Sequence, residues 1–166
     1  MAMGNPQGAD LFLHVQTRRA GKVKGESASE GHVDDIELVG WQWGLSASSA
    51  LGSAQATTRR SYSALTVVKR VDQASTALMA ALATNDEVKE ARLTMRRAGG
   101  TQEDFYTIKL QGARITSVQQ GAESDGETRE TVSIAFTKVD VEYRPQRATG
   151  LRAGSTSFSD ELPQNA

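Results

Sequence analysis

Hydrophobic and polar residues alternate with a period of two along much of the chain, as they do in β-strands that bury one face. Such segments occupy residues 11–16, 91–96 and 106–111. In two longer segments, residues 36–45 and 132–143, the apolar positions change from even to odd numbers partway along. A change of this kind is expected where a strand carries a bulge or bends from one sheet into another. The pattern predicts a mainly β protein of long antiparallel strands, arranged as a barrel or a sandwich.

One segment breaks the alternation and predicts the only helix, over residues 73–84. Asp72 can cap its start, and Asn85 suits the left-handed position after its end. The apolar side chains expected on its buried face are Leu78, Met79 and Leu82.

The rest of the pattern predicts how the chain is divided. Residues 24–35 are polar and punctuated by glycine, and residues 46–60 are rich in small side chains, which is typical of a mobile loop. Periodicity is lost after Pro145. We therefore predict a flexible N-terminus over residues 1–9, one domain over residues 10–146, and a flexible tail over residues 147–166, disordered or docked on a partner.

Composition limits the classes of protein that the chain can belong to. Its 166 residues, 38% of them hydrophobic, suffice for one domain with a substantial core. Nineteen basic against twenty acidic residues give a net charge of -1, so no overall positive field attracts nucleic acid or an anionic membrane. The absence of cysteine excludes disulfides, zinc–thiolate sites and a thiol nucleophile.

The sequence shows neither a classical secretory signal nor a membrane-spanning segment. The N-terminus lacks a basic region followed by an apolar stretch of about 7 to 15 residues, which a cleavable signal would need. No run of about 18 apolar residues occurs, so we expect no membrane span. We expect a protein that folds in the cytoplasm and leaves the cell only through a dedicated machine.

Candidate chemistry is confined to one short loop. In the sequence E-G-H-V-D, Glu30, His32 and Asp34 would project to one side of an extended segment as metal ligands, and Ser27 with His32 and Asp34 invites comparison with a catalytic triad. Such charged loops are common, and triads depend on spatial proximity. The other histidine, His14, lies in a strand-like segment and is expected on a surface or interface. We therefore predict no catalytic residue, cofactor or metal.

Tryptophan and arginine positions leave further alternatives open. Trp41 and Trp43 are two positions apart, so a strand directs both to the same side, into the core or a subunit interface. They could instead be stacking platforms of a barrel that binds single-stranded nucleic acid. Its basic groove would be lined by the pairs Arg18-Arg19, Arg59-Arg60 and Arg96-Arg97. Because acidic residues are as numerous as basic ones, we favour a mixed, neutralised surface. An enzyme built on the E-G-H-V-D loop is the third hypothesis.

Six segments, taken in order, carry a family resemblance. They are K-G-E-S with the histidine that follows, I-E-L-V-G-W-Q-W-G, V-D-Q-A-S-T-A-L-M-A-A-L, L-T-M-R-R-A-G-G, D-F-Y-T-I-K-L and E-T-V-S-I-A-F-T-K-V-D-V-E-Y-R-P-Q. Over residues 10–146 the chain resembles the haemolysin-coregulated protein (Hcp) family, the tube subunits of the type VI secretion system. The chain departs from the family's usual pattern at Ser75-Thr76-Ala77, where proline is frequent, and in residues 46–60, which lack a glycine-rich run.

The resemblance implies a fold and an assembly. The expected fold is an antiparallel β-barrel of two packed sheets with one short α-helix and a protruding loop after the first strand. Six subunits form a ring, and rings stack into a hollow tube inside a contractile sheath, with a spike protein at the tip and small effectors in the lumen. The tube is assembled in the cytoplasm and delivered to the extracellular space or a target cell.

The resemblance also assigns roles to named residues. The protruding loop helps one ring to meet the next, so its polar residues need not be buried and its order comes from a neighbour. The expected ring-stacking residues are Lys24, Gly25, Glu26, Ser27, Glu30, His32 and Asp34. Trp41 and Trp43 would give this loop a rigid base, because each can bury roughly 150–250 Å².

Overall fold

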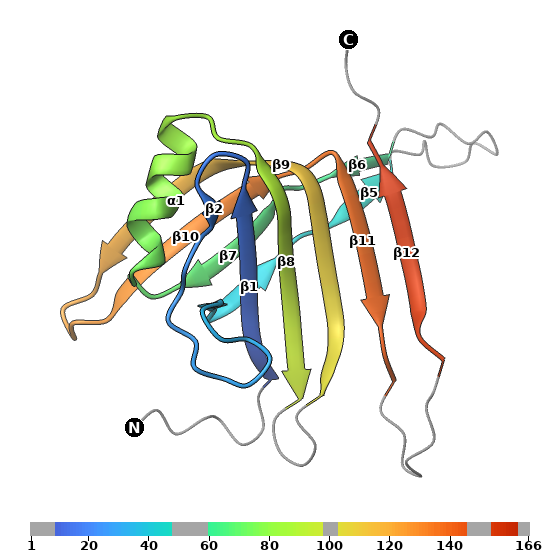
Figure 1. Cartoon of the computed structure of the whole chain (residues 1–166), viewed down its shortest axis with the longest axis horizontal. Coiled ribbons are helices and arrows are strands. Elements are labelled where there is room, and N and C mark those ends of the chain that lie inside the picture. The colour runs from blue at the N-terminus through green and yellow to red at the C-terminus, as the bar shows by residue number, and fades with distance from the viewer. Residues whose placement is uncertain (1–8, 48–59, 98–102, 146–153, 163–166) are drawn as a thin grey trace, which may run out of the picture.

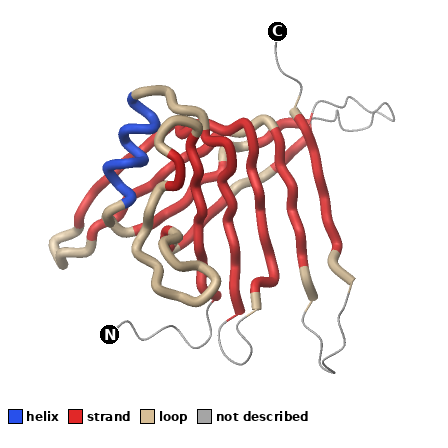
Figure 2. The backbone as a smooth tube through the Cα atoms, viewed as in Figure 1, coloured by secondary structure: helices blue, strands red, loops and turns tan. Residues whose placement is uncertain are grey.

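The computed structural model describes residues 9–47, 60–97, 103–145 and 154–162 (Figure 1). Strands dominate this part of the chain, with one helix at the side of the sheets (Figure 2). The elements are β1 (Ala9–Thr17), β2 (Gly21–Lys22), β3 (Ile36–Glu37), β4 (Gly40–Gln42), β5 (Leu45–Ala47), β6 (Arg60–Tyr62), β7 (Leu65–Lys69), α1 (Ala74–Ala83), β8 (Val88–Arg97), β9 (Asp104–Ala122), β10 (Thr128–Ala135), β11 (Lys138–Tyr143) and β12 (Thr156–Glu161).

Two antiparallel sheets share the long strand β9. Its first half pairs with β8 on one side and β11 on the other, in a sheet that continues to β1 and to β12. Its second half pairs with β10, in a sheet that continues to β7 and β4. We call these the first and the second sheet. The mainly β fold with one short helix is confirmed.

A short connection closes the two sheets into a barrel. β3 pairs with β1 of the first sheet, and β4, three residues further on, pairs with β7 of the second sheet. Between them, Leu38 N–H donates to Leu11 O at 3.0 Å and Val39 N–H donates to Val68 O at 2.7 Å. The chain between β3 and β4 therefore joins the two ends of the series β1, β8, β9, β10, β7 and β4, although β4 and β1 form no ladder with each other. The predicted change of phase within residues 36–45 lies at this crossing.

The core lies between the two sheets. Its fully buried side chains include those predicted from the alternation of apolar positions, namely Leu13, Val15, Ala91, Leu93, Ile108, Leu110, Val132 and Ile134. One part of that prediction is wrong: Val39 and Leu45 are 53% and 52% exposed. The chain crosses from one sheet to the other here, so the inward positions resume only at Trp41 and Trp43.

Helix α1 is one residue shorter at each end than predicted. The Asp72 carboxylate accepts a hydrogen bond from Ala74 N–H at 2.9 Å, and Asn85 has a left-handed backbone with φ of 53°. Its buried face consists of Ala74, Ser75, Leu78 and Ala81, whereas Met79 and Leu82 are exposed. The buried face is thus offset from the predicted one, with Leu78 as its large apolar side chain and small residues around it. No helix among the described residues is long and apolar enough to cross a membrane.

The prediction of a flexible tail is wrong for residues 156–161, which form β12. This strand pairs with β11 over its whole length, from Lys138↔Glu161 to Tyr143↔Thr156, and its side chains are mostly exposed. The segment has a single large apolar residue, Phe158, so alternation of apolar residues could not reveal a strand. The expectations for residues 1–8, 48–59, 146–153 and 163–166 lie outside the described residues.

A buried ion pair joins the start of the helix to the second sheet. The side chains of Lys69 in β7 and Glu130 in β10 are fully buried, with Lys69 Nζ 2.6 Å from Glu130 Oε1. The same ammonium donates to Ser75 Oγ at 3.0 Å and lies 2.8 Å from Asp72 Oδ1. Gln120 donates to the other oxygen of Glu130. Burial acts to raise the pKa of Glu130, but the hydrogen bonds from Lys69 and Gln120 outweigh it and hold this pKa below its ordinary value.

We expect the protein to lose stability in acid because of such carboxylates. The pKa of Asp160 is also lowered, by hydrogen bonds from Arg60 and Tyr62. A carboxyl group whose pKa is lower in the folded state than in the unfolded state stabilises the fold at any pH above its unfolded-state pKa. This contribution is lost as the pH falls through the folded-state pKa. The urea midpoint should therefore decrease between about pH 5 and about pH 3. A Glu130→Gln variant should show a smaller decrease, and a midpoint independent of pH in the parent would contradict the prediction.

Candidate functional site

Residues 24–35, between β2 and β3, fold back on themselves. Gly25 N–H donates to Asp34 O at 2.8 Å, Ser27 N–H to Asp35 O at 3.0 Å, and Asp34 N–H to Ser27 O at 2.9 Å. A Cβ on Gly25 would stand 2.3 Å from Asp35 O, so only glycine permits this approach. The expectation that the loop takes its order from a neighbour is wrong, because its own backbone orders it.

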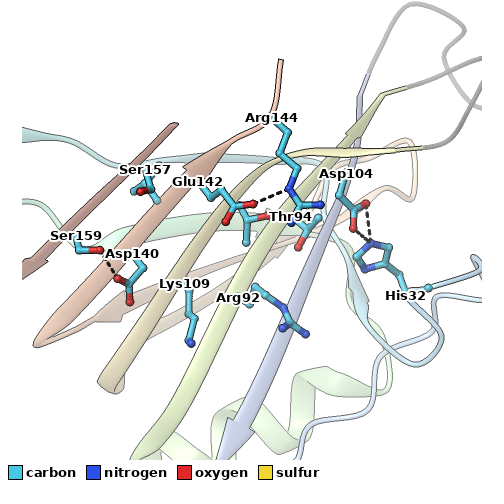
Figure 3. Close-up of a pocket in the computed structure, with 13 residues that line it drawn as sticks. His32, Arg92, Thr94, Asp104, Lys109, Asp140, Glu142, Arg144, Ser157 and Ser159 are labelled. Atoms are coloured by element: carbon cyan, nitrogen blue, oxygen red, sulfur yellow. Dashed lines mark hydrogen bonds and ion pairs between the residues drawn. The ribbon is translucent and has the colours of Figure 1, made fainter. Parts of the chain in front are cut away.

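His32 fixes this loop to the barrel. The side chain is 6% exposed and stacks on Phe12 of β1, with ring centroids 4.2 Å apart and planes 3° apart. Its Nδ1 lies 2.9 Å from Asp35 Oδ2, and its Nε2 lies 3.0 Å from Asp104 Oδ1 at the start of β9 (Figure 3). One ring face and Nε2 of His32 thereby hold the loop to the barrel, while Nδ1 contacts Asp35 within the loop.

Arg96 of β8 completes the attachment. It is 6% exposed, and its Nη2 donates to Glu30 O in the loop at 2.7 Å. Its Nε donates to Asp104 Oδ1 at 3.3 Å, and its guanidinium lies 5.5 Å from the ring centroid of Phe12. We call Phe12, His32, Asp35, Arg96 and Asp104 the loop latch. Sequence reasoning missed its partners, because Asp104 is 72 positions from His32 and no motif links the two.

The metal site and the triad suggested by the sequence are not assembled. Glu30 and Asp34 are exposed, while both nitrogens of His32 are taken by other carboxylates. The hydroxyl of Ser27 accepts a hydrogen bond from Ser29 N–H at 3.2 Å and makes none with His32. In the described ranges no three histidine or acidic side chains could hold a metal ion.

The arginine pairs do not form one basic groove. Arg18 lies 2.7 Å from Glu87, Arg60 binds Asp160, and Arg96 belongs to the loop latch. The side chain of Arg97 lies over the ring of Phe105, 4.3 Å from its centroid. These arginines belong to separate parts of the barrel and most face an acidic partner, which agrees with a mixed surface. Arg59 lies outside the described residues.

Both tryptophans are half-buried and pack against the core. Trp41 stacks on Tyr106 with centroids 6.2 Å apart, and Trp43 stacks on Tyr62 at 5.8 Å and meets the edge of Phe136 at 6.0 Å. Their exposed portions leave a role at a subunit interface as a prediction.

Truncating these side chains should therefore destabilise the subunit. We expect Trp43→Ala to cost about 3 kcal/mol, near the lower end for buried aromatic residues, and Trp41→Ala to cost less because it contacts fewer rings. Urea unfolding followed by circular dichroism gives both values, and size measurement shows whether a folded variant also fails to associate. Two variants with the stability and the size of the parent would contradict this interpretation.

A polar groove of about 560 Å³ crosses the outer face of the first sheet beside the loop latch (Figure 3). Arg92 of β8 and Lys109 of β9 lie along one side, and both lie near Glu90, at 3.9 Å and 3.6 Å. Asp140 and Glu142 of β11 lie along the other side. The groove carries both signs of charge, and within it Ser159 Oγ donates to Asp140 Oδ1 (Figure 3). This hydroxyl–carboxylate pair lies on the exposed last strands of the sheet, so the groove suits polar contact with a macromolecule better than catalysis.

The predicted ring-stacking residues fall into two groups. Gly25, Ser27 and His32 are buried and give the loop its shape, whereas the exposed members of the set are Lys24, Glu26, Glu30 and Asp34. The structure thus presents a firmly held loop with a charged outer surface.

Comparison with known proteins gives a consistent result. A family model described as type VI secretion system effector, Hcp, matches residues 12–143. Protein hcp1 of Pseudomonas aeruginosa is 33% identical over 162 residues, which cover 94% of this chain and 96% of that protein. The Major exported protein of the same organism is 30% identical over 97 residues, covering 57% of this chain and 56% of that protein.

Solved structures agree with this match. A structure described as a type six secretion system protein is similar with a TM-score of 0.83 at 26% identity, covering 93% of this chain and 96% of that one. Hcp1 from Salmonella typhimurium has a TM-score of 0.75 at 24% identity, with 93% and 95% covered, and supports the fold alone. Because the family model spans nearly the whole barrel and a relative aligns along almost the whole chain, this chain belongs to the Hcp family of type VI secretion system proteins.

Proposed function

We propose that this chain is the structural tube subunit of a type VI secretion system, in which rings of six copies stack into a hollow tube. The observation that carries the proposal is the family match over residues 12–143, which includes the barrel, the helix and the latched loop. The number six comes from the family resemblance. The subunit acts mechanically and needs no catalytic residue.

The second sheet supports ring formation because it ends in an unpaired edge on each side. In the described part of the chain, β4 pairs with β7 alone, and residues 114–122 of β9 pair with β10 alone. These edges are different strands at opposite ends of the order β9, β10, β7, β4. Soluble proteins cover such edges, and contact between two unlike edges of identical subunits repeats head to tail until a ring closes.

The loop of residues 24–35 is the proposed contact between stacked rings. Its latch holds it in place before a second ring arrives, so little ordering entropy is lost on contact. Its exposed charges, at Lys24, Glu26, Glu30 and Asp34, would set the register with the facing ring. Each contact can be modest, because identical contacts add up around a ring.

The proposed partners follow from the tube. A contractile sheath surrounds the stacked rings and a spike protein caps the tip, while small effectors travel in the lumen. Rings would assemble in the cytoplasm and be carried out when the sheath shortens. The name of a relative, Major exported protein, supports export.

Light scattering of the purified chain tests the proposal. A discrete six-subunit particle is expected at high micromolar concentration, with no affinity for single-stranded DNA in a gel-shift assay. A monomer at that concentration would count against the tube subunit. If such a monomer also bound DNA with an affinity that falls steeply with salt, a nucleic-acid-binding barrel would be supported instead.

Reversing charges on the loop tests the stacking contact. In a Glu26→Lys, Glu30→Lys variant, like charges would face each other at the ring contact, costing about 1 kcal/mol or more per subunit. The stability of the barrel should change by no more than about 0.5 kcal/mol per exposed substitution. We expect intact rings that stack poorly and support little secretion, with stacking improved by compensating charges on the facing ring. The stacking role is wrong if the variant stacks like the parent, or if it unfolds.

A further inference from the structure

The last strand of the first sheet, β12, has backbone groups that face away from β11, its one partner among the described strands. Its ladder with β11 keeps one register, and just beyond it Leu162 N–H donates to Thr137 O at 2.7 Å. Alternate residues of an antiparallel strand bond to the same neighbour, so the even-numbered residues of β12 bond to β11. The N–H and C=O groups of Ser157, Ser159 and Glu161 therefore point outward.

Among the described residues, only some of these outward N–H and C=O groups have a hydrogen-bond partner. Glu161 N–H donates to Asp160 Oδ1 at 2.9 Å, and Glu161 O accepts from Arg60 Nη2 at 3.1 Å. For Ser157 and Ser159 the described ranges supply no backbone partner on this side, and both residues are exposed. Edge strands are usually protected by lysine, proline or a bulge, and residues 156–161 contain none of these.

An apolar side chain lies at the centre of the same edge. Phe158 is 44% exposed and lies opposite Val141, on the face of the first sheet that leads to the core. Tyr143, two positions from Val141 on that face, is 39% exposed. The open backbone groups are thus flanked by aromatic surface that a further strand would cover.

We propose that β12 pairs antiparallel with β12 of a second copy of this chain, about a two-fold axis at Phe158. In this register each Ser157 lies opposite the partner's Ser159, and both pairs can exchange two hydrogen bonds. Phe158 then faces the partner's Phe158 in a non-hydrogen-bonded pair, where side chains approach most closely. Thr156 faces the partner's Asp160, so no like charges are opposed. This self-complementarity favours a second copy over an unrelated chain.

The contact closes after two copies, since each copy uses its own β12 edge once. It differs from the unlike edges of the second sheet, which would repeat head to tail, and it does not rest on the proposed function. Its effect would be to cover the open edge of β12 in subunits that stand outside a tube.

Disulfide trapping tests the register, because the chain has no cysteine of its own. A Phe158→Cys variant, oxidised with copper–phenanthroline at high micromolar concentration, should form a crosslinked dimer, since the two Cα atoms would be about 4.5 Å apart. Ser157→Cys and Ser159→Cys variants should crosslink when mixed but not separately, because identical positions lie about 7–8 Å apart on a diagonal. The mixture also keeps Phe158 in place.

Proline supplies the matched control. Ser159→Pro removes an outward N–H without removing a bond to β11, so adding it to Phe158→Cys should abolish the crosslink and leave the melting temperature unchanged. A crosslink that survives the proline, or a mixture of the two serine variants that crosslinks no better than either alone, overturns the proposal. Ring formation by the parent is measured separately by light scattering. If the parent forms no ring, the proposed tube function is wrong, but the β12 contact is not affected.

Discussion

Replacing Lys69 by methionine is expected to lower the free energy of unfolding by about 3–5 kcal/mol. The substitution leaves the Glu130 carboxylate fully buried without its ammonium partner, which stands 2.6 Å away in the parent. It also removes the donor to Ser75 that ties the start of α1 to β7. Urea unfolding followed by circular dichroism measures the loss.

A second substitution distinguishes the stability lost through the unpaired charge of Glu130 from the stability lost through altered packing at position 69. In a Lys69→Met, Glu130→Leu variant both charges are gone and the site is apolar, so most of the lost stability should return. If Lys69→Met alone were as stable as the parent, the pair would contribute no net stability. If the double variant were no better than the single one, the cost would come from packing.

Replacing Asp35 by asparagine is expected to weaken the loop latch by about 1.5–3 kcal/mol. Asp35 accepts from His32 at 2.9 Å and lies 3.4 Å from Lys22 Nζ, so the change removes charge from a buried hydrogen-bond network. With the latch weakened, residues 24–35 should detach from the barrel more often than the rest of the fold opens. Trypsin should then cleave after Lys22 or Lys24 faster than in the parent.

The neighbouring residue provides the control for this prediction. Asp34 is exposed, and asparagine tolerates its left-handed backbone with φ of 65°, so Asp34→Asn should leave cleavage unchanged. Asp35→Asn should keep rings intact and impair their stacking. Equal cleavage of the two variants would show that the latch does not hold the loop.

Sequence reasoning succeeded where burial repeats with a fixed period. The inward positions of β1, β8, β9 and β10 followed from alternation, because each of these strands turns one of its two faces toward the same core. The crossing between sheets was visible as a change of phase in residues 36–45. The ends of α1 were marked by Asp72 and Asn85, whose backbone interactions are local.

It failed where structure depends on contacts between distant residues. Nothing in the composition of residues 24–35 shows that His32 contacts Asp104. The loop was therefore expected to leave its polar residues unburied and to be ordered by a neighbouring ring. β12 is a strand because β11 offers it an edge, although its own side chains are mostly exposed. The outward position of Met79 depends on how α1 is rotated about its own axis against the barrel, which the apolar residues of the helix alone do not determine.

Electron microscopy of the purified chain tests the central claim most directly, because rings and stacks of rings are recognisable without labels. The proposed function predicts uniform rings with six-fold symmetry and a central hole, together with short hollow stacks at high protein concentration. Particles the size of a single subunit at every concentration, with neither rings nor stacks, would contradict the proposal that this chain is a tube subunit.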